Sequence, residues 1–116
     1  MGEAAAARES ALRDEVEALL PAAPVRDEWP FVSMVVPTHN GLPLLERLAA
    51  GLVSCTDYQR LELVVVDNAS TDGTVDWLER EEMPFAVTVV ANAQNESFSV
   101  ACNRGAAAAS GELLLF

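Results

Sequence analysis

A chain of 116 residues is one domain or part of one, and a hydrophobic content of 51% is enough to build a core of that size. The formal net charge is −11 and all 7 basic residues are arginines. So acidic a chain repels nucleic acid and anionic lipid, which argues against binding through a basic patch.

The N-terminal sequence lacks a signal-peptide pattern, and the apolar runs are too short to cross a bilayer. We therefore expect a cytoplasmic location, with any attachment to the inner face of a membrane supplied by parts outside this chain.

Residues 1–30 are predicted to form an amphipathic helix followed by a linker. From Leu12, apolar residues follow i, i+4, i+7 and i+8 spacing, which places them along one stripe of a helix over residues 3–20. Pro21 ends this helix, and the prolines and alanines of residues 21–24 are typical of a short, stiff linker.

Strand and helix patterns alternate from residue 31 onward. Residues 31–36 are rich in β-branched and apolar residues between prolines, which predicts a strand. Pro43 suits the first turn of a helix, where no N–H is needed, and this helix is predicted to run to about Cys55. Residues 61–66 are nearly all apolar, a pattern typical of a strand that is covered on both faces.

The same alternation continues to the end of the chain. Residues 74–81 are predicted to be helical, residues 85–90 a strand, residues 97–109 a helix and residues 113–116 a strand. Strands that alternate with helices pair in parallel through right-handed crossovers. We therefore expect residues 31–116 to form an α/β domain with an open, mostly parallel sheet and flanking helices.

Three polar loops are predicted to meet at one edge of this sheet. They span residues 37–41, 67–73 and 91–97, and each follows an apolar strand. In open parallel sheets, ligands bind outside the carboxyl ends of the strands, so these loops are expected to line a ligand crevice. Ser70 or Asp72 is predicted to cap the helix after the second loop.

Three common functions of α/β domains lack their motifs here. The turn after the first strand, Pro-Thr-His-Asn-Gly-Leu, contains one glycine and not the three of a dinucleotide-binding fingerprint. The chain has no Walker A motif, and the first strand ends without the acidic residues that a phosphorylated receiver domain uses to hold magnesium.

The two cysteines indicate neither a metal site nor a redox centre. Cys55 and Cys102 match no metal-ligand spacing and no C-x-x-C motif. Both fall in predicted helices among small apolar residues, so we expect buried free thiols.

Three segments together resemble the family-2 glycosyltransferases, in that family's order and spacing. They are VSMVVPTHNGLPLLERL (32–48), LELVVVDNASTDGTVDWL (61–78) and NESFSVACNRGAAAASGELLLF (95–116). The third segment is most similar to the rhamnosyltransferase-like branch, although Ser97 stands where an N-x-GF run has its glycine.

The resemblance implies the GT-A fold, of which these residues would be the Rossmann-like, nucleotide-binding half with strand order 3-2-1-4. It also implies a nucleotide-diphospho-sugar donor of the UDP or dTDP type, and transfer with inversion to a hydroxyl of a glycan or lipid-linked acceptor. A divalent metal, Mg²⁺ or Mn²⁺, and a role in cell-surface polysaccharide biosynthesis follow from the same resemblance.

The resemblance assigns nucleotide binding to residues in all three segments. They are Pro37, Thr38, Asn40, Asp67, Asn68, Asn95, Asn103 and Arg104. In the family, the carboxylate at the position of Asp67 accepts a hydrogen bond from the N3–H of the pyrimidine base, and a carboxylate, which only accepts, suits an N–H donor.

Several of these residues have a second interpretation. Arg104 either approaches the diphosphate, for which its planar fork is suited, or lies on the helix surface. Asn68 also fits a loop-shaping role, as do Ser70 and Asp72. His39, which has no visible carboxylate or serine partner, is expected to line a wall and not to act as a base.

The family places a metal-binding Asp-x-Asp motif directly after a strand like residues 113–116, and the catalytic base further on. The resemblance therefore implies that these groups lie beyond Phe116. We expect an active parent protein, and a 116-residue chain that binds nucleotide weakly, holds no metal tightly and transfers no sugar. In the family's strand order the last strand is an exposed apolar edge, which favours self-association.

Two other hypotheses remain open from the sequence. The chain is a noncatalytic nucleotide- or sugar-binding module, or it is a structural α/β unit that binds no ligand.

Overall fold

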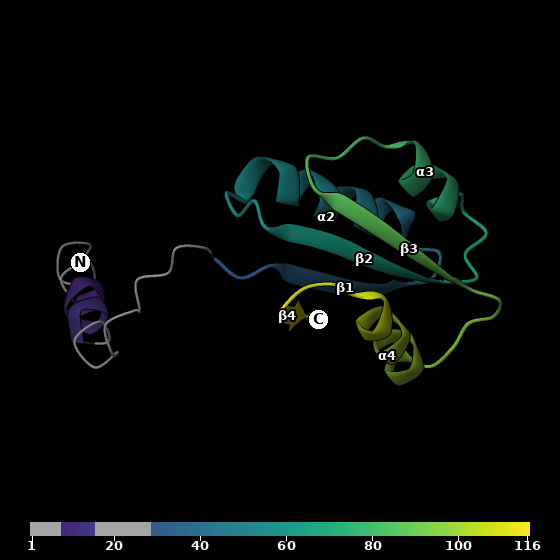
Figure 1. Ribbon diagram of the computed structural model, residues 1–116. Coiled ribbons are helices and arrows are strands. Elements are labelled where there is room, and N and C mark those ends of the chain that lie inside the picture. Colours follow the sequence, from purple (N-terminus) through teal and green to yellow (C-terminus); the bar gives the residue numbers. More distant parts are fainter. Residues whose placement is uncertain (1–7, 16–28) are drawn as a thin grey trace.

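The computed structural model describes residues 8–15 and 29–116 (Figure 1). Residues 8–15 are helical and exposed, and the rest of the helix and linker predicted over residues 1–30 lies outside the described residues. Strands and helices alternate along the remainder: β1 (Val32–Thr38), α2 (Leu42–Cys55), β2 (Leu61–Asn68), α3 (Thr74–Arg80), β3 (Ala86–Asn92), α4 (Phe98–Ala108) and β4 (Leu113–Leu115).

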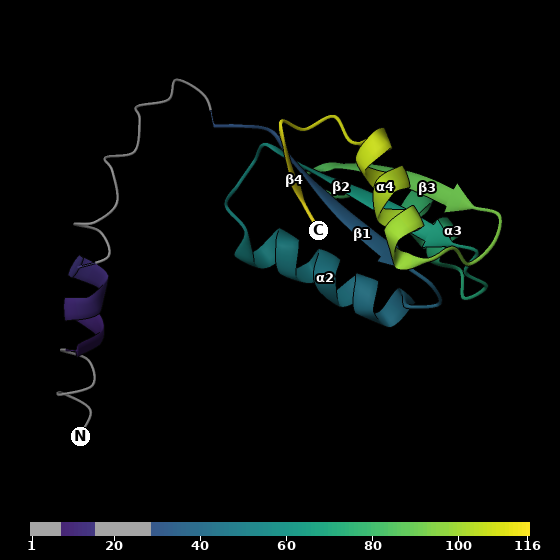
Figure 2. The same ribbon diagram turned by 90° about the horizontal axis from the view of Figure 1, so that it is seen from below.

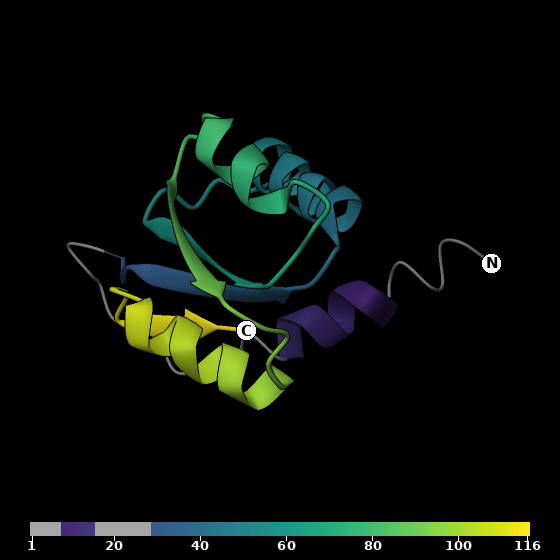
Figure 3. The same cartoon turned by 90° about the vertical axis from the view of Figure 1, so that its right-hand side faces the viewer.

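The predicted fold class is confirmed. All four strands pair in parallel in the order β3-β2-β1-β4, which is the predicted order 3-2-1-4. The carboxyl ends of β1, β2 and β3 point to one edge of the sheet (Figure 2). Helices α2 and α3 cover one face and α4 covers the other (Figure 3).

The first three strands run two residues further than predicted. Thr38 pairs with Asp67 across β1 and β2, and Asn68 pairs with Asn92 across β2 and β3. Asparagine and aspartate disfavour strands and proline lacks a backbone N–H, so the sequence pattern ended each strand early. The parallel ladder overrides these preferences because it satisfies backbone groups at the strand ends, where Asp67, Asn68 and Asn92 are buried.

The core has one layer on each face of the sheet, and β2 lies between them, buried at every residue. Alternate side chains of β2 point to opposite faces. Leu63 and Val65 pack with Leu45 of α2 and Leu78 of α3. On the other face, Ala101 of α4 packs with three residues of the sheet, Val35, Val64 and Val66.

Helix α4 lies so close to the sheet that only glycine fits at one position. A Cβ atom on Gly105 would lie 2.3 Å from Cγ1 of Val35 and 2.8 Å from Cγ2 of Val66. Both distances are far inside van der Waals contact, and Val35 is itself buried. The absence of a side chain at residue 105 therefore sets the spacing between α4 and the strands.

A buried carboxylate joins three segments at the amino end of the sheet. Oε1 of Glu62 accepts hydrogen bonds from the Ser33 hydroxyl at 2.6 Å, the Ser110 N–H at 2.7 Å and the Ser110 hydroxyl at 2.9 Å. The Ser33 hydroxyl oxygen in turn accepts from the N–H of Gly111 at 2.8 Å. Glu62 thus ties β1 and β2 to the segment that leads from α4 into β4.

These contacts also set the ionisation of Glu62. Burial by itself raises the pKa of this carboxyl, but the hydrogen bonds from Ser110 and Ser33 outweigh that effect and hold the pKa below its usual value of 4.5. The folded chain therefore favours the charged form of Glu62 more than the unfolded chain does.

Strand β4 lies beside β1 at the edge of the sheet, and all three of its residues are exposed (Figure 2). Self-association through this edge stays a prediction. The expectation of buried thiols is wrong: Cys55 is exposed because it is the last residue of α2, and Cys102 is half-buried. Among the described residues, no helix is long and apolar enough to cross a membrane.

The first prediction tests the close approach of α4. Gly105→Ala should destabilise the fold by about 2 kcal/mol, because overpacking costs about 1–3 kcal/mol and exceeds the ~1 kcal/mol that alanine gains in a helix. Gly51→Ala, in α2, is the matched control, since a Cβ there meets nothing within 4 Å. It should stabilise the chain by up to about 1 kcal/mol in urea unfolding. Equal effects of the two substitutions would contradict the packing argument.

The second prediction concerns the pH dependence of stability. Because the pKa of Glu62 is lowered on folding, the carboxylate stabilises the fold above its ordinary pKa of 4.5, and this stabilisation is lost as pH falls through the lower folded value. Glu62→Gln should therefore be less stable than wild type at pH 7, and the difference in unfolding free energy should shrink between pH 5 and pH 3.

Glu79→Gln controls for the loss of one negative charge, because Glu79 is exposed on α3. A difference between wild type and Glu62→Gln that stays constant from pH 7 to pH 3 would show that the charge of Glu62 does not stabilise the fold.

Candidate functional site

The turns that follow β1 and β2 meet at the carboxyl edge of the sheet. Thr38 and Asp67 are direct partners in the parallel register, so the two strands end side by side. Pro37 and Thr38 are half-buried at the carboxyl end of β1, and they line a cavity of about 290 Å³ together with His39 and Leu44. The structure thus brings together residues that lie almost 30 positions apart in the sequence.

Asp67 is the most buried ionisable group at this edge, with 2% of its surface exposed. Oδ2 accepts a hydrogen bond from the N–H of Ser70 at 3.1 Å. Oδ1 is buried, and no donor among residues 8–15 and 29–116 reaches it. An unsatisfied buried acceptor costs about 1–3 kcal/mol, and more when charged, so a ligand that donates to Oδ1 would recover this free energy.

Asn40 ties the turn after β1 to the turn after β2. Its backbone N–H donates to the Ser70 hydroxyl at 2.9 Å, and its Oδ1 accepts from the N–H of Thr71 at 2.7 Å. Asn40 has φ 50° and Ala69 has φ 53°, in the left-handed region that few residues other than glycine adopt. The side-chain oxygen of Asn40 is therefore engaged within the chain.

Asp72 also joins the turn after β2 to the start of α2. Oδ2 accepts from the N–H of Leu42 at 3.0 Å, and Oδ1 accepts from the hydroxyl and the N–H of Thr74. The hydrogen bond from the Thr74 hydroxyl, followed by that from Leu42, lowers the pKa of Asp72 below its usual value.

The predicted cap of α3 is correct in part. Asp72 satisfies the Thr74 N–H at the start of the helix, but the N-cap residue is Gly73, whose φ of 83° favours glycine. Ser70, the other predicted cap, contacts Asn40 and Asp67 instead.

His39 lies against the end of β2. Its Nδ1 is 2.6 Å from the carbonyl oxygen of Asn68. A carbonyl only accepts, so Nδ1 carries the proton. Nε2 lies 3.4 Å from Nδ2 of Asn40. Both ring nitrogens are therefore in contact with the chain, which fits the expected wall position.

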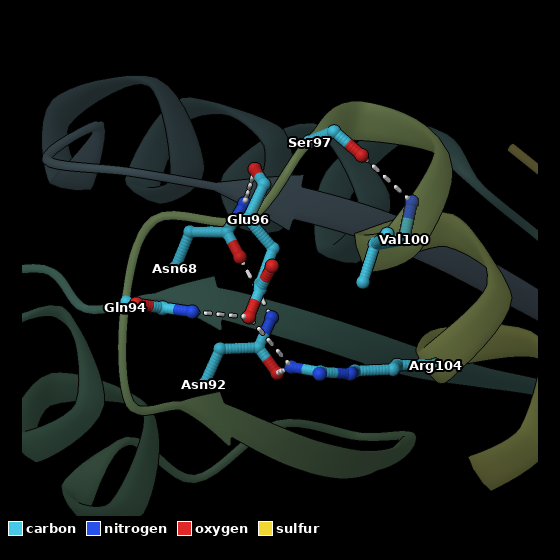
Figure 4. A network of polar contacts seen from close by, with 7 residues as sticks. All are labelled: Asn68, Asn92, Gln94, Glu96, Ser97, Val100 and Arg104. Atoms are coloured by element: carbon cyan, nitrogen blue, oxygen red, sulfur yellow. Dashed lines mark hydrogen bonds and ion pairs between the residues drawn. The ribbon is translucent and has the colours of Figure 1, made fainter.

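A polar network connects β2, β3 and α4 (Figure 4). Nδ2 of Asn92 donates to Oδ1 of Asn68 at 2.7 Å, and Nη1 of Arg104 donates to Oδ1 of Asn92 at 2.8 Å. The same Nη1 lies 3.5 Å from Oε1 of Glu96. Nδ2 of Asn68 donates to the carbonyl oxygen of Glu96 at 3.3 Å.

The remaining predicted site residues lie at the margin. Asn95 and Asn103 are exposed, and neither takes part in the network of Figure 4. Asn92 and Glu96 were not identified from the sequence, because the third strand was predicted to end two residues before Asn92. Its position directly opposite Asn68 depends on the register of β2 and β3.

The described residues do not fit a metal ion. Within residues 8–15 and 29–116, no three histidine, cysteine, aspartate or glutamate side chains gather closely enough to hold one. Of the carboxylates of Asp67 and Asp72, Asp72 accepts hydrogen bonds from the chain through both oxygens, and Asp67 accepts one through Oδ2.

Comparisons with known proteins agree with this geometry. Residues 33–116 match the family model "Glycosyl transferase family 2". The mannosyltransferase PcManGT from Pyrobaculum calidifontis, solved in complex with GDP-Man and Mn²⁺, is 32% identical with a TM-score of 0.67, and the match covers 89% of this chain and 32% of that protein.

Two curated relatives are each 30% identical to this chain. The putative teichuronic acid biosynthesis glycosyltransferase TuaG of Bacillus subtilis is 30% identical over 75% of this chain and 34% of its own length. The dolichol-phosphate mannosyltransferase of Pyrococcus furiosus is 30% identical over 72% of this chain and 24% of its own length. The chain thus spans about a third or less of the relatives it matches.

The parallel sheet of order 3-2-1-4, the polar turns at its carboxyl edge and the family match over residues 33–116 agree with one another. The chain belongs to glycosyl transferase family 2 and carries part of a GT-A-like fold.

Proposed function

We propose that residues 31–116 bind the nucleoside part of a nucleotide-diphospho-sugar, and that the whole protein transfers the sugar to an acceptor hydroxyl with inversion. The observation that carries this proposal is the unpartnered Oδ1 of Asp67, buried at the carboxyl end of the central strand. The ligand contacts expected from the family lie in the turns around it, at Pro37, Thr38 and Asn40.

The hydrogen bonding of Asp67 favours a pyrimidine base of the uracil or thymine type. Oδ2 is already engaged by the N–H of Ser70, so the carboxylate offers one free acceptor oxygen. Uracil and thymine present one N–H between two carbonyl groups, which suits a single acceptor. Guanine presents two adjacent donors, which suit a carboxylate with both oxygens free. Cytosine has no N3–H to donate.

The comparisons support a nucleotide-sugar donor without defining its base. PcManGT was solved with GDP-Man, so a guanine nucleotide is the competing ligand for this site. The relative named for teichuronic acid biosynthesis supports a role in cell-surface polysaccharide synthesis. Assignment to the rhamnosyltransferase-like branch rests on residues 95–98 alone.

We place the metal and the acceptor outside the described residues. The Mn²⁺ in PcManGT supports a divalent cation in the whole protein, but the described part of this chain lacks a cluster of ligands for it. We therefore propose no catalytic step for any residue of this chain. The acceptor, a glycan or a lipid-linked hydroxyl, follows from the family resemblance.

The third prediction tests the base contact. In Asp67→Asn, the single amide oxygen can serve either Ser70 or the base, so the variant loses one hydrogen bond to a charged group, worth about 1.5–3 kcal/mol. The Kd of the chain for UDP or dTDP, measured by calorimetry, should rise roughly 10- to 100-fold.

Asp76→Asn is the matched control, because Asp76 is an exposed carboxylate on α3. It should leave the Kd unchanged while removing the same charge. Tighter binding of GDP than of UDP and dTDP would reject the pyrimidine assignment. No binding of any of the three nucleotides by wild type would reject the nucleoside site in this chain.

A further inference from the structure

The two buried amides of Asn68 and Asn92 form a chain of hydrogen bonds with a direction. Arg104 donates to Asn92, Asn92 donates to Asn68, and Asn68 donates to the carbonyl oxygen of Glu96 (Figure 4). Each amide has one donating and one accepting end, so each could be turned by 180°. If one of the two amides were turned alone, their two NH₂ groups or their two oxygens would face each other. Only a turn of both amides together would keep the hydrogen bond between them.

The two ends of this chain prevent such a turn. A guanidinium group only donates, so Arg104 requires the oxygen of Asn92 to face it. A backbone carbonyl only accepts, so Glu96 requires the nitrogen of Asn68 to face it. Asn68 and Asn92 are 6% and 8% exposed, and water has little access to replace a lost partner. Arg104 thus determines the orientation of both amides.

These amides lie next to the proposed nucleoside site. Asn68 follows Asp67 in β2, and its carbonyl oxygen holds His39. Its side chain holds the loop between β3 and α4 through Glu96. The contacts of Asn68 therefore connect His39, in the turn after β1, with Glu96, in the loop after β3.

The charge of Arg104 is already matched within the chain. The Nη1 atom that donates to Asn92 also lies 3.5 Å from the Glu96 carboxylate, and that carboxylate accepts from Nε2 of Gln94 at 3.2 Å. Asn92 and Glu96 thus contact the guanidinium group directly, and Gln94 holds the Glu96 carboxylate. A diphosphate would have to compete with these contacts.

We propose that Arg104 is a positioning residue of the nucleoside site and not a ligand of the diphosphate. By donating to Asn92, it fixes the direction of the amide chain and holds the loop at residues 93–97 against the end of β2. This inference rests on the proposed function, because the site that Arg104 positions is the one around Asp67.

The experiment compares Arg104→Met and Arg104→Lys, with uridine and UDP titrated separately into the 116-residue chain. Methionine keeps the unbranched apolar stem of the side chain but cannot donate, whereas lysine, like arginine, only donates. Arg104→Met should raise the Kd for uridine and for UDP by the same factor, about 3- to 10-fold. Arg104→Lys should stay within about twofold of wild type for both.

Arg80→Met, which removes an exposed arginine from α3, is the matched control for charge and should change neither Kd. Weaker binding of UDP with unchanged binding of uridine in Arg104→Met would assign Arg104 to the diphosphate and overturn the proposal. Unchanged binding of both ligands would overturn it as well.

A second readout needs no ligand and separates this inference from the proposed function. In NMR spectra of the free chain, the side-chain NH₂ signals of Asn68 and Asn92 should be sharp in wild type and in Arg104→Lys. In Arg104→Met they should broaden or shift, and the amides of residues 93–97 should exchange faster with solvent. If wild type binds no nucleoside, the proposed function fails. If these signals are unchanged in Arg104→Met, the positioning role fails.

Discussion

The complete burial of β2 is the constraint on which the rest of this structure depends. A strand covered on both faces and paired on both edges leaves no polar group to water, so every polar side chain along it needs a partner inside the chain. Glu62 and Asn68 have such partners in Ser33, Ser110 and Asn92. Asp67 has a partner for one carboxylate oxygen only, and this difference is the basis for the proposed nucleoside site at the carboxyl end of the strand.

The same constraint explains how α4 is held. Between the helix and the sheet lie small side chains and Gly105, which allow close contact but little apolar area. Polar anchors complete the attachment: Glu62 receives the segment after the helix, and Arg104 reaches from the helix to Asn92. Both anchors join α4, or the segment that follows it, to β2 or β3 of the sheet. Polar contacts therefore hold α4 near both the amino and the carboxyl ends of the strands, and they keep the β3–α4 loop beside the proposed nucleoside site.

These features belong to a chain of glycosyl transferase family 2. The chain covers about a third of PcManGT, and the described residues lack a metal-ligand cluster. The described residues supply a buried strand, two turns tied by Asn40 and Asp72, and a helix packed through Gly105. In the proposed function, this scaffold holds the base, and the chemistry is assigned to other segments.

The sequence by itself determined the order and type of the elements over residues 31–116, because apolar runs, prolines and glycines act locally on the backbone. With the family resemblance it also predicted the strand order, which the structure confirms, and a nucleotide-binding role for Asp67, which stays a prediction. Tertiary structure alone decided that the strands extend through Thr38, Asn68 and Asn92, since cross-strand pairing satisfies residues that locally favour turns. It also decided that Cys55 is exposed and that Arg104 faces Asn92 and Glu96, because such partners depend on register and helix placement and not on sequence spacing.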